Sequence, residues 1–256
     1  MLGPLGRRVK NLLAGVLESR GYRVVPGDLP WAVPHFAHRA ILECGVSAVL
    51  DIGANVGQFA IDLRASGFAG RVVSFEPQAA AFAALSQASA ADPGWECHRL
   101  GLASQPGRLA MHISAFSPSS SMLPIGQRHV ELFPFTAETG IEEVEVVRLD
   151  DWVAARTDLP AGLFLKVDTQ GFETPVLKGG TRTLAAAAGA LVELNFAELF
   201  DGQSKYYDVM RLLDEAGLKL FSLFDMSLAP ENRSYLWGDG LFLRPEAAAR
   251  VTRVIR

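Results

Sequence analysis

The sequence contains little cysteine, with Cys44 and Cys97 as the two thiols among 256 residues. Two thiols cannot build a disulfide framework or a cysteine-rich zinc site, so a reducing compartment fits best. Long hydrophobic runs are also absent, because no stretch approaches the ~20 apolar residues that a membrane-spanning helix needs. The first residues lack the features of a signal peptide. We therefore expect a soluble, cytoplasmic protein.

An excess of positive charge is missing too, since 24 Lys and Arg residues stand against 28 Asp and Glu residues, for a formal net charge of −4. Such a chain offers no broad attraction to phosphate backbones, so we expect no nucleic-acid partner. Hydrophobic residues make up 49% of the chain, which is enough for a packed core in one large domain.

Residues 1–34 are predicted to form a helical extension and a lead-in segment, and residues 35–256 the main domain. Apolar residues recur at helical spacing in the extension, among basic ones, and prolines at 26, 30 and 34 then end the helix. The favoured interpretation is a helix half-buried against the main domain or against the second chain of a homodimer. The alternative is peripheral contact with an anionic membrane surface.

From residue 35 onward, strand patterns alternate with helix patterns of about ten residues, which indicates a mostly parallel sheet with right-handed crossovers. The predicted strands cover 47–53, 71–77, 95–103, 163–168, 189–195, 218–224 and 238–245. Two further strand patterns, 107–114 and 142–150, form a predicted inserted pair around the long loop 115–141. A loop of that length inside a compact domain is usually functional or mobile.

The segment "VLDIGANVGQF", residues 49–59, places Gly53 and Gly57 directly after the first predicted strand. Ligands of open α/β sheets bind at the carboxyl ends of the strands, and glycine lets the backbone approach them closely. Glu76 ends the second strand within "VVSFEP", where a carboxylate can accept both hydroxyls of a ribose. These features predict a cofactor that carries an adenosine ribose.

The spacing of the glycines favours S-adenosylmethionine over a dinucleotide. A dinucleotide site uses G-x-G-x-x-G to admit a pyrophosphate, whereas Ala54-Asn55-Val56 separate the two glycines here. Asp51 before the loop would repel a pyrophosphate but attract the ammonium group of a methionine moiety.

Together, "VLDIGANVGQF", "VVSFEP", "FLKVDTQGFETPVLKGG" and "LVELN" resemble the FkbM-type S-adenosylmethionine-dependent methyltransferases. The resemblance covers residues 40–245 or so. It implies an α/β fold of the class I methyltransferase (Rossmann-like) type, with seven strands of which the last is antiparallel, helices on both faces, and O-methylation. Family members often read Asp-x-Glu-Gly where this chain has Asp168-Thr169-Gln170-Gly171.

By this resemblance, the methionine end of the cofactor lies against Asp51, Gly53, Asn55 and Gly57, with Ala54 in the same turn. Glu76, followed by Pro77, is expected to bind the ribose. The adenine is expected beside residues 99–102, where Leu100 or Leu102 suits its apolar face.

A hydroxyl acceptor must lose its proton during methyl transfer, so a nearby base is expected. Asp168, at the end of its strand, is the first choice, and His112 and His129, which flank the long loop, are further candidates. By strand alternation Lys166 lies on the same face as Asp168, so a structural ion pair is the alternative for Asp168.

Asp168, Glu193 and Asn195 follow two strands that are expected to be neighbours, and their oxygens suit Mg²⁺. A magnesium site is therefore a further expectation. For the acceptor, we expect contacts from the hydroxyls of Ser119, Ser120 and Ser121 and from three residues late in the chain, Tyr206, Trp237 and Asp239.

The sequence thus predicts an S-adenosylmethionine-dependent O-methyltransferase that acts on a sugar, a glycolipid or a natural-product small molecule. Two alternatives stay open at this point. One is a nucleotide-linked (NAD) oxidoreductase, and the other is a cofactor-binding partner protein without catalytic activity.

Overall fold

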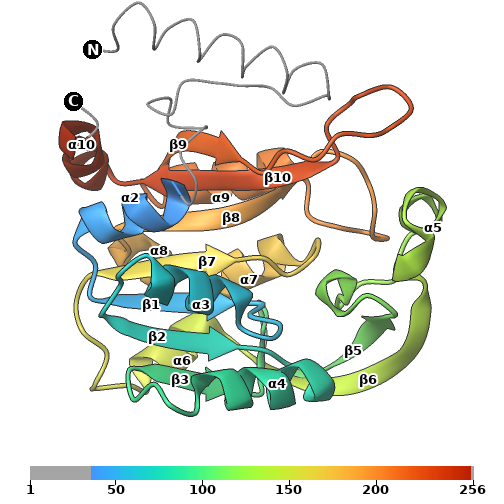
Figure 1. Cartoon of the computed structure of the whole chain (residues 1–256), viewed down its shortest axis with the longest axis horizontal. Helices are drawn as coiled ribbons and strands as arrows, with labels where there is room; N and C mark the ends of the chain where they lie inside the picture. The colour runs from blue at the N-terminus through green and yellow to red at the C-terminus, as the bar shows by residue number, and fades with distance from the viewer. Residues whose placement is uncertain (1–35, 255–256) are drawn as a thin grey trace, which may run out of the picture. The chain divides into compact units, whose positions relative to one another are not determined.

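The structure is a computed structural model that describes residues 36–254, so the predicted N-terminal extension lies outside the described residues (Figure 1). The description begins with helix α2 (Phe36–Cys44) and ends with helix α10 (Pro245–Val254). None of the helices in this part of the chain combines the length and apolar character needed to cross a membrane.

A seven-stranded sheet forms the centre of the domain, in the order β3-β2-β1-β7-β8-β10-β9 (Figure 1). Its strands are β1 (Ala48–Ile52), β2 (Arg71–Phe75), β3 (Trp95–His98), β7 (Leu163–Val167), β8 (Gly189–Asn195), β9 (Lys219–Phe224) and β10 (Trp237–Leu243). Strand β10 pairs antiparallel with both neighbours, while β3, β2, β1, β7 and β8 pair in parallel. This is the class I methyltransferase arrangement that the resemblance implies, so the predicted fold is confirmed.

The central strands are buried on both faces, as expected for parallel strands covered by helices on each side. Every residue of β1, β7 and β8 is buried. Helices α3 (Gln58–Ala65) and α4 (Ala79–Ser89) follow β1 and β2. Helices α6 (Leu149–Ala154), α7 (Glu173–Gly179), α8 (Thr181–Ala186) and α9 (Tyr206–Glu215) pack against one another as a layer (Figure 1).

The predicted strand 95–103 is wrong as one element. Strand β3 ends at His98, and the Leu100 amide donates to the His98 carbonyl at 3.0 Å. The chain then forms β4 (Gly101–Leu102), which belongs to a second sheet of order β4-β6-β5. The break falls within an unbroken run of residues without Gly-Pro or Asn-Gly turn signals, so the sequence pattern alone did not reveal it.

The inserted strand pair is confirmed as β5 (Gly107–Ser114) and β6 (Glu138–Val147), which pair antiparallel. The predicted loop between them also contains short helices, namely α5 (Gln127–Leu132) and the 3-10 turns Ser117–Ser119 and Pro134–Thr136. Helices this short show no apolar periodicity in a sequence. The segment between β5 and β6, residues 115–137, is called the inserted segment below.

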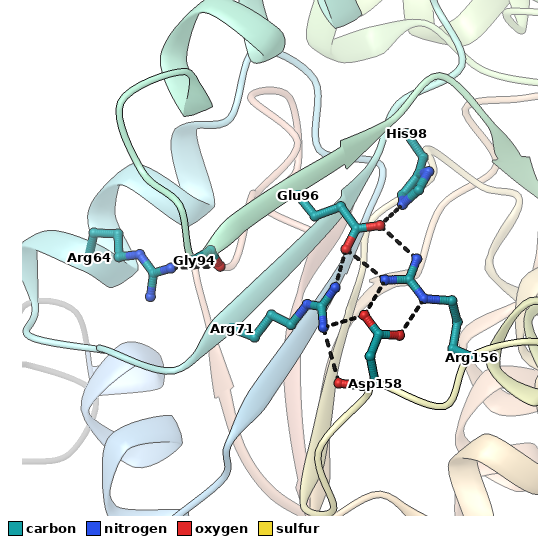
Figure 2. A network of polar contacts seen from close by, with 7 residues as sticks. All are labelled: Arg64, Arg71, Gly94, Glu96, His98, Arg156 and Asp158. Carbon is teal, nitrogen blue, oxygen red and sulfur yellow. Dashed lines mark hydrogen bonds and ion pairs between the residues drawn. The ribbon is translucent and has the colours of Figure 1, made fainter.

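A network of charged side chains ties the edge strand β3 to its neighbours (Figure 2). The Glu96 carboxylate accepts hydrogen bonds from Arg71 at the start of β2 and from Arg156 after α6, the latter at 2.6 and 2.8 Å. His98 contacts the same carboxylate at 2.6 Å, and Asp158 pairs with both arginines. These partners lower the pKa of Glu96 to about 2, and the hydrogen bonds from Arg156 have the largest effect.

Candidate active site

The loop after β1 begins with a turn that requires glycine. Gly53 has φ +78°, and a Cβ at this position would lie 1.8 Å from the Asp168 carbonyl oxygen on the neighbouring strand. The amides of Gly53 and Ala54 both donate to the Phe75 carbonyl at 3.1 Å. The loop is thus held between β2 and the end of β7, with its backbone at the carboxyl edge of the sheet.

Asp51 lies beneath this loop, fully buried, and does not belong to the cavity lining described below. Its lateral partners in the sheet register are Ser74 on β2 and Lys166 on β7. Ser74 Oγ donates to Asp51 Oδ2 at 3.0 Å, and Lys166 Nζ lies 3.5 Å from Asp51 Oδ1. Asp51 therefore acts on the site through these two side chains.

Lys166 connects Asp51 with the loop and with Asp168. Its Nζ donates to the Gly53 carbonyl at 2.9 Å and lies 3.5 Å from Asp168 Oδ2. Burial lowers the pKa of Lys166, but Asp168, Asp51 and Asp239 outweigh this and raise it above its usual value. Lys166 stays charged, and the ion pair with Asp168 that the sequence allowed is present.

Glu76 is fixed at the end of β2 by backbone amides. Asn55 N donates to one carboxylate oxygen and Gln78 N to the other, each at 2.8 Å. Each oxygen keeps a lone pair for a further donor, so two ribose hydroxyls fit this carboxylate. Burial raises the pKa of Glu76 to about 7, against the lowering effect of the two amide bonds.

A first cavity of about 300 Å³ opens over this loop. Its lining contains seven of the predicted cofactor residues, Gly53, Ala54, Asn55, Glu76, Pro77, Leu100 and Leu102. Both leucine candidates for the adenine therefore belong to it. Gly57, with φ +93°, caps the start of α3 and packs against Trp95 instead of lining the cavity.

A second cavity of about 250 Å³ adjoins the first. It is lined by aromatic and acidic side chains together, including Phe116, His129, Glu193, Phe200 and Trp237. Four residues line both cavities: Pro118, Asp168, Gln170 and Asp239. We call these four residues the junction, because a group bound in one cavity meets a group bound in the other there.

The acidic side chains around the junction are linked by amide groups. Gln170 Nε2 donates to Asp168 Oδ1 at 2.8 Å and to Glu193 Oε1 at 3.1 Å. Asn195 Nδ2 donates to Glu193 Oε2 at 3.3 Å and to Glu173 Oε2 at 3.4 Å. These hydrogen bonds connect five side chains in the order Asp168, Gln170, Glu193, Asn195 and Glu173.

Burial and the charges of neighbouring acids raise the pKa values of Glu173, Glu193 and Asp239. Glu173 rises to about 7, mainly because it is buried, although it accepts hydrogen bonds from Thr169 and from Gly171 N. Burial, then the charges of Asp168 and Glu173, raise the pKa of Glu193 well above its usual value. Asp239 rises to about 7 through burial and the charge of Asp168.

The two candidate histidines lie in different places. His129, on α5, lines the second cavity, and its Nδ1 has no hydrogen-bond partner among the described residues. Burial lowers its pKa, which favours the neutral ring. His112, on β5, is absent from the lining of both cavities and pairs with Glu138 at 2.7 Å. The structure thus brings His129 together with Asp168 and leaves His112 apart.

The predicted acceptor residues are also divided. Ser119 lines the second cavity, whereas Ser120 and Ser121 line the first. Ser120 Oγ accepts from Ser114 N, and Ser121 Oγ donates to the Gln170 carbonyl at 2.7 Å, so both hydroxyls hold the inserted segment in place.

Trp237 and Asp239, both on β10 and both expected from the sequence to contact the acceptor, line the second cavity. Tyr206 does not line either cavity in the described part of the chain. It is exposed at the start of α9 and packs against Phe196.

The magnesium expectation gains no support from the donor set. The described residues contain no group of three or more His, Cys, Asp or Glu side chains arranged to hold a metal ion. Asn195, one of the three expected ligands, directs its amide nitrogen rather than a free oxygen at the neighbouring carboxylates.

Sequence reasoning missed several residues of the site. Gln170, Gln78 and Lys166 line the first cavity, and Asp225 and Phe116 line the second. Gln170 stood within a strand-end motif that the sequence analysis quoted, so its position was a usable signal. Phe116 and Asp225 come from a loop and a strand end far away in sequence, and nothing local marks them.

Hydrogen bonds between side chains also link the loop after β1, called the cofactor loop below, to the inserted segment. Asn55 Nδ2 donates to Ser117 Oγ at 2.9 Å, and Ser117 Oγ donates to Gln78 Oε1 at 3.0 Å. Pro118 and Ser119, which follow Ser117 directly, belong to the second cavity.

Residues 51–220 match the family model described as "Methyltransferase FkbM domain". A protein named "Methyltransferase 1" from Beauveria bassiana is 26% identical over 183 residues, which cover 67% of this chain and 72% of that protein. The "2-O-methyltransferase NoeI" of Sinorhizobium fredii is 25% identical over 221 residues, or 82% of this chain and 89% of its own length.

Among solved structures, the magnesium protoporphyrin IX methyltransferase of Synechocystis, determined with bound S-adenosylmethionine, is similar with a TM-score of 0.43 and 9% identity. That alignment covers 95% of this chain and 85% of the other.

Proposed function

We propose that this chain, which belongs to the FkbM methyltransferase family and is an S-adenosylmethionine-dependent methyltransferase, methylates a hydroxyl oxygen of a sugar, a glycolipid or a natural-product small molecule. One observation carries the proposal. The cavity that holds the predicted cofactor residues meets a second cavity at a carboxylate, Asp168, and methyl transfer to a hydroxyl needs both an acceptor site and a base at such a meeting point.

The residues of the first cavity fit S-adenosylmethionine. Glu76 offers free lone pairs to the ribose, Leu100 and Leu102 offer an apolar wall, and the backbone of Gly53 is open to close approach. When bound, S-adenosylmethionine supplies an electrophilic methyl group to an oxygen nucleophile and leaves as S-adenosylhomocysteine.

Asp168 is the proposed base. Its Oδ1 accepts the Gln170 amide, and its Oδ2 lies 3.5 Å from Lys166 at the junction, where an acceptor hydroxyl can give up its proton. His129 is the second candidate, because its unpartnered ring nitrogen belongs to the same cavity. His112 stays a prediction from the sequence.

The wall of the second cavity supports a sugar-like acceptor. Trp237 and Phe116 offer aromatic faces, while Asp239 and Asp225 offer acceptors for hydroxyl groups. The name of the relative from Sinorhizobium fredii, a 2-O-methyltransferase, supports oxygen as the methylated atom.

The test is a turnover assay with a panel of hydroxylated acceptors, with S-adenosylhomocysteine formation as the readout and NMR of the product to locate the methyl group. Calorimetric titration with S-adenosylhomocysteine, and with NAD for comparison, accompanies it. Transfer to nitrogen or carbon acceptors alone would contradict O-methylation. Tight binding without any turnover would favour the non-catalytic alternative, and saturable NAD binding the oxidoreductase.

Asp168→Asn separates the base from the rest of the site. We expect kcat to fall by about 10²- to 10⁴-fold, since the amide cannot take a proton, while the affinity for S-adenosylhomocysteine changes less than about threefold. Asp62→Asn, an equal change at an exposed position on α3, is the control. An equal loss of kcat and affinity in Asp168→Asn would assign Asp168 a structural role.

The proposed surroundings of the enzyme are those expected from the sequence: the cytoplasm, a small-molecule or glycoconjugate acceptor and no nucleic acid. Membrane contact and homodimer formation through residues 1–34 concern a segment outside the described residues. Sedimentation with anionic vesicles and size-exclusion chromatography test them.

A further inference from the structure

Gln170 has a backbone conformation that non-glycine residues seldom adopt. Its φ is +54°, and Gly171 follows with φ +91°. A left-handed residue with a side chain is strained and persists when the surrounding contacts fix it.

The contacts of Gln170 come from three separate parts of the chain. Its carbonyl accepts Ser121 Oγ of the inserted segment at 2.7 Å. Its side-chain nitrogen donates to Asp168 at the end of β7 and to Glu193 on β8. Gln170 is thus the residue that connects both strand ends with the inserted segment at the junction.

The amide nitrogen of Gln170 occupies the space between two carboxylates. Two carboxylates brought together in a buried site repel each other unless a cation or hydrogen-bond donors lie between them. An NH₂ group has two hydrogens, one for each carboxylate, and cannot lose them at ordinary pH. Asn195 makes the same kind of bridge between Glu193 and Glu173, so both oxygens of Glu193 face amide donors.

We propose that Gln170 is a positioning residue whose amide bridges Asp168 and Glu193 in the place of a divalent cation, so that methyl transfer by this chain is independent of metal. Gln170 fixes Asp168 through Oδ1, while Oδ2, which lies 3.5 Å from Lys166 Nζ, keeps lone pairs for the acceptor hydroxyl. The role of Asp168 as base rests on the proposed function, whereas the bridge between the carboxylates does not.

The first test needs no acceptor and uses Mn²⁺ as the probe. Calorimetry and electron paramagnetic resonance measure Mn²⁺ binding to the wild type and to Gln170→Glu, which replaces the bridging amide with a third carboxylate. Gln87→Glu, the same change at an exposed position on α4, is the control. We expect Gln170→Glu to bind Mn²⁺ at least about tenfold more tightly than the wild type and the control, since charge and ligand number both rise.

Two outcomes of this titration would overturn the bridge. The first is no gain in Mn²⁺ affinity for Gln170→Glu. The second is tight binding to the wild type that Glu193→Gln abolishes, because a cation would then displace the amide in the native chain.

The second test measures turnover in the presence of EDTA. The wild type is expected to keep its kcat, whereas Gln170→Ala and Gln170→Glu lose about 10- to 100-fold in kcat with less than about a threefold change in affinity for S-adenosylhomocysteine. Mn²⁺ added in excess over EDTA is expected to restore part of the activity of Gln170→Glu but not of Gln170→Ala. Inactivation of the wild type by EDTA, or a parallel loss of kcat and affinity in both variants, would refute the positioning role.

The Mn²⁺ titration fails separately from the proposed function, whereas the turnover test depends on it. A wild type that methylates no hydroxyl acceptor contradicts the proposed function, and the Mn²⁺ titration still decides whether Gln170 bridges the two carboxylates.

Discussion

Cofactor binding should depend on pH through Glu76. This carboxyl is buried, its pKa is raised to about 7, and both of its oxygens already accept backbone amides. The ionised form offers free lone pairs to two ribose hydroxyls, whereas the protonated form loses one of these acceptors to its own proton. Affinity for S-adenosylhomocysteine should therefore rise as the pH rises through 7.

The magnitude follows from the pKa. If the ionised form binds, the apparent Kd equals the intrinsic Kd multiplied by one plus the ratio of protonated to ionised Glu76. With a pKa of about 7, this factor is about 11 at pH 6 and about 1.1 at pH 8. The affinity should therefore be about tenfold weaker at pH 6, and binding at pH 6 should release roughly 0.9 proton per site.

Calorimetry in buffers of different ionisation enthalpy measures both quantities. Glu76→Gln should lose about 1–3 kcal/mol of binding free energy and most of the pH dependence, since an amide cannot serve both backbone donors. Asp239→Asn is the comparison variant: the pKa of Asp239 is also raised to about 7 and its side chain lines the same cavity, so this variant separates the contribution of Asp239 to the pH dependence from that of Glu76. An unchanged slope in Glu76→Gln, or a wild-type change below twofold, would refute the reasoning.

Two further predictions concern the loop and the edge of the sheet. Gly53→Ala should weaken S-adenosylhomocysteine binding more than tenfold and destabilise the fold by about 2 kcal/mol or more, because its Cβ would meet the Asp168 carbonyl. Gly67→Ala, with φ +98° and nothing within 4 Å, controls for backbone strain alone, and equal effects in calorimetry and thermal unfolding would contradict the clash. Arg156→Ala should lower the free energy of unfolding by about 1–2 kcal/mol at pH 7, after allowance for the partial exposure of the pair. The reason is that Arg156 lowers the pKa of Glu96 to about 2, so the ionised carboxylate stabilises the fold at pH values above its ordinary pKa. This contribution is lost as the pH falls toward 2. Urea unfolding at pH 7 and pH 3 measures it, and an equal loss at both would show that Arg156 acts through packing.

The cofactor loop could be predicted because its signals are local. Gly53 and Glu76 each follow directly after a strand, and adjacent parallel strands bring their carboxyl ends to one edge of the sheet, so the motif alone places them together. Asp51 could not be placed in the same way. Its partner Lys166 lies 115 residues further along the chain and becomes its neighbour through the register of β1 and β7.

The acceptor side resisted prediction for related reasons. Ser120 and Ser121 have a sequence typical of a solvated loop, yet their hydroxyls hold the inserted segment. The role of Gln170 depends on a left-handed backbone angle, which leaves no mark in the sequence, and on contact with Glu193 of β8, which the sequence analysis expected to hold a metal instead. Fold and cofactor loop follow from short-range patterns, whereas the junction follows from contacts between distant segments.

The hydrogen-bonded chain from Asn55 through Ser117 to Gln78 also has a thermodynamic consequence. Ser117 precedes the residues that the inserted segment contributes to the second cavity, so a ligand that shifts either end of this chain changes the free energy of the other site. Linkage of this kind is reciprocal. Whatever factor the cofactor product adds to acceptor affinity, the acceptor must add to the affinity for that product, and the size of this factor depends on contacts of the inserted segment as well as on the sheet.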